Sequence, residues 1–262
     1  MLNNLIDKTL LLLLVTLMSV ACVAEHDEPL RYGELSVSLS GEPEVEVLTR
    51  TPVALDPTAT EAAGYMVRIY NSSDVELYRS SYADFEAQRL PLGTYYVTAE
   101  NCTVDEAEEG NGKMRLYGRS NDVSLSLETL VQTAEVNCTV ANAKVSVKFD
   151  ESVKDRFSGL KVTLAGGTTS GRILTIYETA SDVITETWFN PSELTYSILG
   201  TFNAGGLQKD VNISETIELQ SRNNIRLVVK VNVDNGQLTP VLKVDTQIDD
   251  PKELSGEFNP YK

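Results

Sequence analysis

Apolar and polar residues alternate with a period of two along most of the chain after residue 32. The clearest example is residues 225–248, where two alternating runs flank an Asn-Gly pair at 235–236. Alternation predicts strands with one buried face, and Asn-Gly is typical of a two-residue hairpin turn. Such a turn places Val233 opposite Leu238 and directs the apolar side chains of both strands to one face.

Similar alternating segments recur along the chain, and no stretch after the leader has a sustained helical period. We therefore predict an all-β fold of sandwich or barrel type. A break in the alternation at 141–142 divides the strands into two groups, each long enough to bury its own core. We expect two tandem β-sandwich domains, at residues 32–141 and 142–250, and a tail at residues 251–262. The further segments are 33–40, 65–70, 74–80, 94–101, 122–127, 131–140, 144–149, 160–165, 173–179 and 194–202.

An apolar run from Thr9 to Ala21 lies behind Lys8 and ends at Cys22. It is too short to span a bilayer as a helix of about 20 residues, so we interpret residues 1–21 as a signal peptide. The small residues before Cys22 resemble a bacterial lipoprotein processing site, in which this cysteine is acylated and keeps the chain at the membrane. A plain secretory cleavage nearby is the alternative.

Residues 22–31 form a predicted acidic tether, because Glu25, Asp27 and Glu28 lie within six residues of Cys22. Acidic residues at this place resemble the surface-export signal of Bacteroidetes lipoproteins. We therefore expect a lipid anchor in the outer membrane, with the folded part of the chain on the cell surface.

The formal net charge of the chain is −16, from 22 basic and 38 acidic residues. So negative a surface repels nucleic acid, which we exclude as a partner. The only histidine is His26, in the predicted tether, which removes histidine-based catalysis and histidine-based metal sites from both predicted domains. We predict a protein that is not an enzyme and has no cofactor; a pair of carboxylates that hydrolyses glycosides is the alternative.

Acidic residues gather in the segment DEAEEGNG at 105–112. Ala107 interrupts the alternation of oxygen ligands that a calcium-binding EF-hand loop requires. We therefore interpret this segment as a solvated loop tip and predict no metal site.

Two cysteines, Cys102 and Cys138, fall within the first predicted domain. In an oxidising compartment a disulfide between them would contribute about 3–4 kcal/mol in the chain-entropy model. Cys138 also continues an apolar strand face, so two buried thiols are an equally open alternative. The densest aromatic point is Trp188 beside Phe189, whose rings either stack on a glycan or belong to a core.

Three segments resemble a fimbrillin-like family of Bacteroidetes surface lipoproteins, known mainly as a domain of unknown function. They are LPLGTYYVTAEN (90–101), LYG (116–118) and VNCTVANAKVSVKF (136–149), and the resemblance extends over most of residues 33–250. It implies two transthyretin-like β-sandwiches in series, as in subunits of the type V pili of this bacterial group. It also implies a fimbrial or adhesin-type protein whose partners are other fimbrial subunits or a host ligand.

In that pilus family an arginine-specific protease cuts after an N-terminal strand, and the groove left behind accepts a strand from the next subunit. Here Arg50 follows the first predicted strand and is the predicted cleavage site, with an ordinary loop arginine as the alternative. The tail after Ile248 lacks the alternation of a donor strand, which favours an anchor, tip or accessory subunit. The alternative function is a surface glycan-binding lipoprotein for nutrient capture, with Trp188 as its platform.

Overall fold

The computed structural model describes residues 31–41, 53–54, 64–169, 171–178, 184–204, 206–232, 237–245 and 251–255. Within these residues the regular structure is almost entirely β-strand, and no α-helix is present. The exceptions are two short 3-10 turns, η1 (Glu106–Glu108) and η2 (Glu151–Val153). The predicted all-β fold of sandwich type is therefore confirmed.

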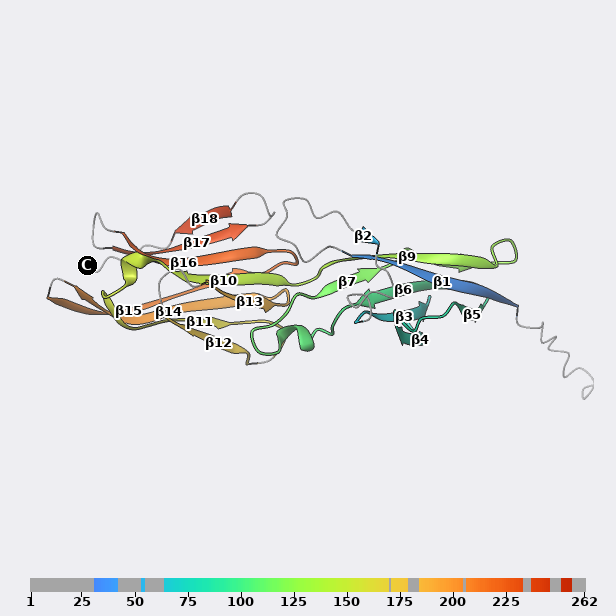
Figure 1. Ribbon diagram of the computed structural model, residues 1–262, viewed down its shortest axis with the longest axis horizontal. Helices are drawn as coiled ribbons and strands as arrows, with labels where there is room; N and C mark the ends of the chain where they lie inside the picture. The colour runs from blue at the N-terminus through green and yellow to red at the C-terminus, as the bar shows by residue number, and fades with distance from the viewer. Residues whose placement is uncertain are drawn as a thin grey trace, which may run out of the picture.

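The N-terminal half forms one sheet that folds over on itself. Its strand order is β2-β1-β9-β7-β6-β3-β4, with β5 paired to β1 and β8 paired to β6. β9 changes partner along its length, since residues 131–138 run parallel to β1 and residues 139–140 run antiparallel to β7. As a result, β1 and β9 face β3 and β6 across a hydrophobic cluster (Figure 1). The strands are β1 (Tyr32–Gly41), β2 (Val53–Ala54), β3 (Met66–Asn71), β4 (Glu76–Ser81), β5 (Gln88–Pro91), β6 (Gly93–Glu100), β7 (Leu116–Arg119), β8 (Val123–Leu125) and β9 (Val131–Val140).

The C-terminal half consists of two sheets packed around a second hydrophobic cluster. One sheet has the order β13-β10-β16-β17-β18, and the other has the order β12-β11-β14-β15. β10 and β16 run parallel, whereas the other pairs in these sheets run antiparallel. The strands are β10 (Ala143–Phe149), β11 (Phe157–Ala165), β12 (Ile173–Tyr177), β13 (Ile184–Phe189), β14 (Glu193–Ala204), β15 (Leu207–Glu218), β16 (Asn224–Asn232), β17 (Gln237–Asp245) and β18 (Pro251–Ser255).

The alternating apolar positions of the sequence fill both clusters, because every second side chain of a strand points to the same face. Burying one such aliphatic side chain contributes about 1.5–3 kcal/mol. The first cluster includes Leu35, Leu39, Val67, Ile69, Val97, Ala99, Ala134, Val136 and Cys138. The second includes Val145, Val147, Val162, Leu164, Phe189, Tyr196, Ile198, Ile225, Leu227 and Val229.

The boundary between the two clusters lies at the point where the alternation breaks. Among their buried members, the first cluster ends at Val140 and the second begins at Ala143. Asn142 lies between them with 0% exposure, and its side chain accepts a hydrogen bond from the Arg115 N–H at 3.1 Å and donates one to the Lys113 carbonyl at 2.8 Å. Figure 1 shows the two halves arranged end to end. We propose that the chain divides into two sandwich units at this boundary.

The predicted C-terminal hairpin forms, but its register differs from the predicted one. Leu238 pairs with Val231 instead of Val233, so four residues, 233–236, connect the strands instead of two. The Asn-Gly pair itself lies outside the described residues. Because a shift by two residues keeps every side chain on its own face, the alternation does not distinguish these registers.

The predicted tail also contains a strand. β18 (Pro251–Ser255) pairs antiparallel with β17 and extends the sheet. The tail was set apart because it lacks a long alternating run, and a short edge strand forms at residues 251–255 without one.

Candidate functional site

Two predicted site residues lie outside the described residues, namely Cys22 for lipidation and Arg50 for cleavage. Both stay predictions. In the described part of the chain, no helix has the length and apolar character needed to cross a membrane. Within the same residues, no group of three or more His, Cys, Asp or Glu side chains is placed to hold a metal ion.

Cys102 and Cys138 are two separate, buried thiols in the structure. The Sγ atom of Cys138 lies 3.6 Å from the Ala99 carbonyl oxygen, and that of Cys102 lies 3.9 Å from the Met114 carbonyl oxygen. Burial raises the pKa of Cys138 to about 12 and also raises the pKa of Cys102. Of the two alternatives left open by the sequence, the structure has the unbonded thiols.

Trp188, the predicted glycan contact, lies where the two halves meet. It belongs to β13 of the C-terminal half, is partly buried, and packs against the N-terminal cluster. Its backbone N–H donates to the Asn111 carbonyl at 2.9 Å, and its backbone carbonyl accepts from the Arg172 Nη1 at 2.7 Å. Because the side chain is partly buried against this cluster, the indole does not present an open face as a platform for a sugar.

Residues 103–113, which we call the junction loop, contain the acidic segment, whose Asp105, Glu106 and Glu109 are exposed as the sequence predicts, whereas Glu108 is buried. In the junction loop η1 places Glu108 against the C-terminal half, where the residue is 5% exposed. Its carboxylate accepts hydrogen bonds from the backbone N–H groups of Thr168 at 3.1 Å, Thr169 at 2.8 Å and Asn190 at 2.9 Å. Burial by itself raises the pKa of Glu108, but these hydrogen bonds together outweigh it, so the pKa is lowered.

Arg172 holds the junction loop from the C-terminal half. Its Nη2 donates to the Gly110 carbonyl at 3.2 Å, and its guanidinium carbon lies 4.2 Å from the centroid of the Phe189 ring. Glu108 and Arg172 thus bind the two halves to each other with charged groups from both sides.

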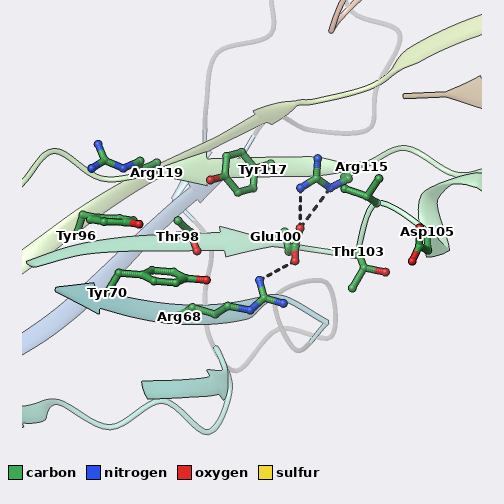
Figure 2. Close-up of a pocket in the computed structure, with 11 residues that line it drawn as sticks. Arg68, Tyr70, Tyr96, Thr98, Glu100, Thr103, Asp105, Arg115, Tyr117 and Arg119 are labelled. Atoms are coloured by element: carbon green, nitrogen blue, oxygen red, sulfur yellow. Dashed lines mark hydrogen bonds and ion pairs between the residues drawn. The ribbon is translucent and has the colours of Figure 1, made fainter. Parts of the chain in front are cut away.

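A polar pocket of about 520 Å³ lies on the N-terminal sheet, over β3, β6 and β7. The strand alternation explains its composition, because the positions between the buried core residues point to the opposite face of the sheet. Figure 2 shows these side chains gathered over three neighbouring strands. β3 supplies Arg68 and Tyr70, β6 supplies Tyr96, Thr98 and Glu100, and β7 with the residue before it supplies Arg115, Tyr117 and Arg119.

Glu100 lies between two arginines within this pocket (Figure 2). Its Oε1 accepts a hydrogen bond from the Arg68 Nη1 at 2.6 Å, and its Oε2 accepts one from the Arg115 Nη2 at 2.8 Å. The Glu100 side chain is only 8% exposed, and a carboxylate buried so deeply is costly without charged partners. The three side chains therefore fix one another in position.

Tyr96 is held between two neighbours at the other end of the pocket. Its ring stacks on Tyr70 with centroids 5.0 Å apart and planes 11° apart, and the Arg119 guanidinium lies 3.9 Å from the Tyr96 centroid. Because β3 and β7 flank β6 on opposite sides, these neighbours cover opposite faces of the ring. Burial, followed by the nearby Asp74 and Glu76 carboxylates, raises the pKa values of Tyr96 and Tyr70, so both hydroxyls keep their protons at neutral pH.

Of the pocket residues, only Asp105 was considered from the sequence, as part of the acidic segment, and no pocket was predicted. The available signal was that the outward positions of VRIY, YYVTAE and RLYGR carry arginine, tyrosine, threonine and glutamate. These side chains form one site only because β6 lies between β3 and β7. The alternation of the sequence does not indicate this strand order.

The fold and the pocket define a class, an all-β protein of packed sheets with a polar site on a sheet face. The chain belongs to the family described as Domain of unknown function (DUF4493), whose model matches residues 32–253. The predicted membership of a family known as a domain of unknown function is thereby confirmed. A search of curated proteins gives no match.

The chain is also similar to solved structures of low sequence identity. A fimbrial assembly protein from Parabacteroides distasonis is 9% identical, with 86% of this chain and 99% of that chain covered and a TM-score of 0.47. The fimbrial anchor protein from Porphyromonas gingivalis is 13% identical, with 84% of this chain and 100% of that chain covered and a TM-score of 0.46. Similarity at this level does not by itself indicate a shared function.

Proposed function

We propose that this protein is a non-enzymatic cell-surface lipoprotein of fimbrial or adhesin type. In this proposal it is anchored in the outer membrane through Cys22 and acts by contact with other proteins. Family membership does not supply the function, because DUF4493 is a domain of unknown function. The proposal rests on the position of β1 in its sheet.

β1 is the first described strand, and it lies inside the sheet instead of at its edge. It pairs in parallel with β9 along Glu34–Gly41 and antiparallel with β5 along Tyr32–Leu35. Leu35 and Leu39 point into the N-terminal cluster and are 0% and 1% exposed. Removal of β1 would therefore leave a groove along β9 with two empty side-chain sites.

Such a groove favours the binding of another strand. Truncation of a buried leucine to alanine costs about 2–5 kcal/mol, and the β9 backbone over residues 131–138 would lose its partners. A strand from a second subunit with the same alternation would restore both the hydrogen bonds and the buried side chains. Backbone hydrogen bonds would then supply affinity, and the sites of Leu35 and Leu39 would supply specificity.

The predicted cleavage site has a suitable place in the sequence for this step. Arg50 lies between β1 and β2, so cleavage after it separates β1 from β2 and from the rest of the described chain. At the other end of the chain, β18 pairs with β17 in its own sheet. A C-terminal segment engaged in this way supports an anchor, tip or accessory subunit over a shaft subunit.

The test digests the full chain with an arginine-specific protease and adds a fluorescent peptide of residues 33–41. We expect cleavage after Arg50 and uptake of the peptide by the cleaved chain but not by the intact chain. A peptide with Leu35→Asp and Leu39→Asp serves as the control and should not bind. Equal uptake of both peptides, or no uptake after cleavage, would contradict strand addition, as would surface-purified protein that contains no chain starting at Thr51.

Surface glycan binding for nutrient capture is the second candidate function. Its predicted platform, Trp188, packs against the N-terminal cluster, so the indole does not favour this role. The surface that does favour it is the pocket over β3, β6 and β7, because this pocket combines hydroxyl, guanidinium and carboxylate groups.

A further inference from the structure

We infer that the pocket over β3, β6 and β7 binds a neutral saccharide. This site goes beyond the fimbrial function and does not depend on strand addition, because the pocket lies on the face of these strands that is turned away from the N-terminal cluster. Its volume of about 520 Å³ falls in the range of about 300–1,000 Å³ typical of small-molecule sites.

The balance of charge in the pocket decides between a neutral and an anionic ligand. Its three guanidinium groups, those of Arg68, Arg115 and Arg119, stand beside the carboxylates of Glu100 and Asp105 in the same lining. At the border of the pocket, the Glu76 Oε2 lies 3.8 Å from the Arg68 Nε, and the Asp122 Oδ1 lies 3.1 Å from the Arg119 Nη2. The carboxylates thus offset the positive charge, in a chain whose net charge is −16. An anion would gain little here, whereas a ligand with many hydroxyl groups finds both donors and acceptors.

Several polar groups of the pocket keep hydrogen-bonding capacity for such a ligand. Among the described residues, no hydrogen-bond partner is found for the Tyr117 hydroxyl, the Arg115 Nη1 or the Arg68 Nη2. The exposed Asp105 carboxylate adds an acceptor at the end of the pocket beside Thr103 (Figure 2). A saccharide ring with adjacent hydroxyl groups can accept from a guanidinium and donate to a carboxylate or a hydroxyl.

The pocket is also held in place before any ligand binds. Glu100 fixes Arg68 and Arg115 through hydrogen bonds of 2.6 Å and 2.8 Å, and Tyr70 with Arg119 holds Tyr96. Since these side chains are already ordered, little conformational entropy is lost on binding. A row of cross-strand pairs also stabilises a sheet without any ligand, so the experiment must separate binding from stability.

The experiment titrates the detergent-purified full chain with neutral hexasaccharides, namely cellohexaose, xylohexaose and mannohexaose, and with hexagalacturonate, by isothermal calorimetry. We expect at least one neutral hexasaccharide to bind with an affinity that does not change between low and high salt. Hexagalacturonate should bind more weakly, because the pocket carries no excess positive charge.

Matched variants locate the binding. Arg119→Gln and Arg79→Gln each remove an exposed strand arginine that is ion-paired with a carboxylate three residues away in the sequence, but only Arg119 lines the pocket. We expect about a tenfold loss of affinity for Arg119→Gln, the effect of one charge-assisted hydrogen bond, and no change for Arg79→Gln. Tyr117→Phe, which keeps the ring under Arg115, should weaken binding while leaving the melting temperature unchanged.

Three outcomes would overturn the inference. One is that no neutral hexasaccharide binds, and the second is that Arg119→Gln and Arg79→Gln bind equally well. The third is that hexagalacturonate binds best with an affinity that falls steeply with salt, which would assign the pocket to acidic saccharides. None of these results bears on the uptake of the β1 peptide, so the inference and the fimbrial function fail separately.

Discussion

Two buried glutamates of the described chain, Glu100 and Glu108, are stabilised by different partners. Glu100 accepts hydrogen bonds from two guanidinium groups of its own sheet. Glu108 accepts three from backbone N–H groups of the other half of the molecule. A backbone N–H cannot move to another acceptor without local refolding, so the charge of Glu108 is directly linked to the contact between the halves.

We expect Glu108→Gln to lower the free energy of unfolding at pH 7 by about 1.5–3 kcal/mol, the value of a hydrogen bond to a charged group. The carboxamide would present N–H groups to a site that already offers donors. Because folding lowers the pKa of Glu108, the carboxylate stabilises the fold above the unfolded pKa of about 4.3 and this contribution is lost as the pH falls through the lower folded value. The difference between variant and parent should therefore shrink below about pH 4.

Urea unfolding followed by the fluorescence of Trp188, the only tryptophan, measures this effect. Glu109→Gln is the control, since Glu109 is the exposed neighbour of Glu108 in the junction loop. A loss of stability of the same size in both variants, or a loss for Glu108→Gln that persists unchanged at pH 3, would argue against the assigned role.

The burial of the two thiols leads to a prediction about their reactivity. We expect neither Cys102 nor Cys138 to react with iodoacetamide in the folded chain at pH 8, because both are buried and the pKa of Cys138 is raised to about 12. Both should react once the chain is unfolded in urea without a reductant. Mass spectrometry of the peptides that contain each cysteine checks this. A linked pair of peptides would instead establish the disulfide alternative.

At the scale of elements, β1 contributes side chains to the N-terminal cluster and is also the strand that the proposed assembly mechanism removes. We expect Leu39→Ala to destabilise the fold by about 2–5 kcal/mol, because the 1% exposed side chain leaves a cavity in the N-terminal cluster. Ser38→Ala, on the exposed face of the same strand, should change stability by less than about 0.5 kcal/mol. Chemical denaturation of both variants gives the comparison, and similar losses would mean that β1 does not contribute Leu39 to the core.

Most of the strands could be predicted from the sequence, although β7, β13 and β15 were missed, but which strands pair with one another could not. The alternation at 131–140 predicts β9 with its buried face, yet nothing in that run indicates that β9 pairs in parallel with β1, which begins about 100 residues earlier. The register at Leu238 was wrong for a similar reason, since a shift by two residues leaves the pattern intact. The pocket was missed because it depends on strand order across β3, β6 and β7.

The burial of Glu108 could not be predicted, because its partners are backbone N–H groups about 60 to 80 residues away in the sequence. Backbone donors leave no trace in side-chain composition. Acidic composition therefore correctly indicated a loop at 105–112 but gave no information on what the loop contacts.

At the scale of the whole molecule, the junction loop connects two halves that lie end to end (Figure 1), each with its own hydrophobic cluster. Glu108 and Arg172 cross between the halves, and Trp188 packs from one half against the cluster of the other. A protein that transmits force or presents a surface at a fixed distance from a membrane benefits from such a junction, because relative motion of two domains is the usual expectation when few contacts join them.

Gly112 offers a way to weaken this junction without touching either cluster. It has a φ of +78°, and an added Cβ would lie 2.6 Å from the Trp188 carbonyl oxygen and 2.9 Å from the Ala107 carbonyl oxygen. Gly110 in the same loop has a φ of +58° and open space around its Cβ position. Alanine at either position carries a similar left-handed backbone cost of about 1–2 kcal/mol, so the difference between the two variants reports the contacts of Gly112 with Trp188 and Ala107.

We expect Gly112→Ala to separate the thermal unfolding of the two halves into distinct calorimetric transitions, with a red shift of Trp188 fluorescence before the second. Gly110→Ala should retain the calorimetric profile of the parent at a slightly lower temperature, because the junction loop still seats on β13 through Asn111 and Trp188. If both variants behave alike, the junction loop does not couple the halves, and the hydrogen bonds of Asn142 at the changeover between clusters would be the next contacts to test.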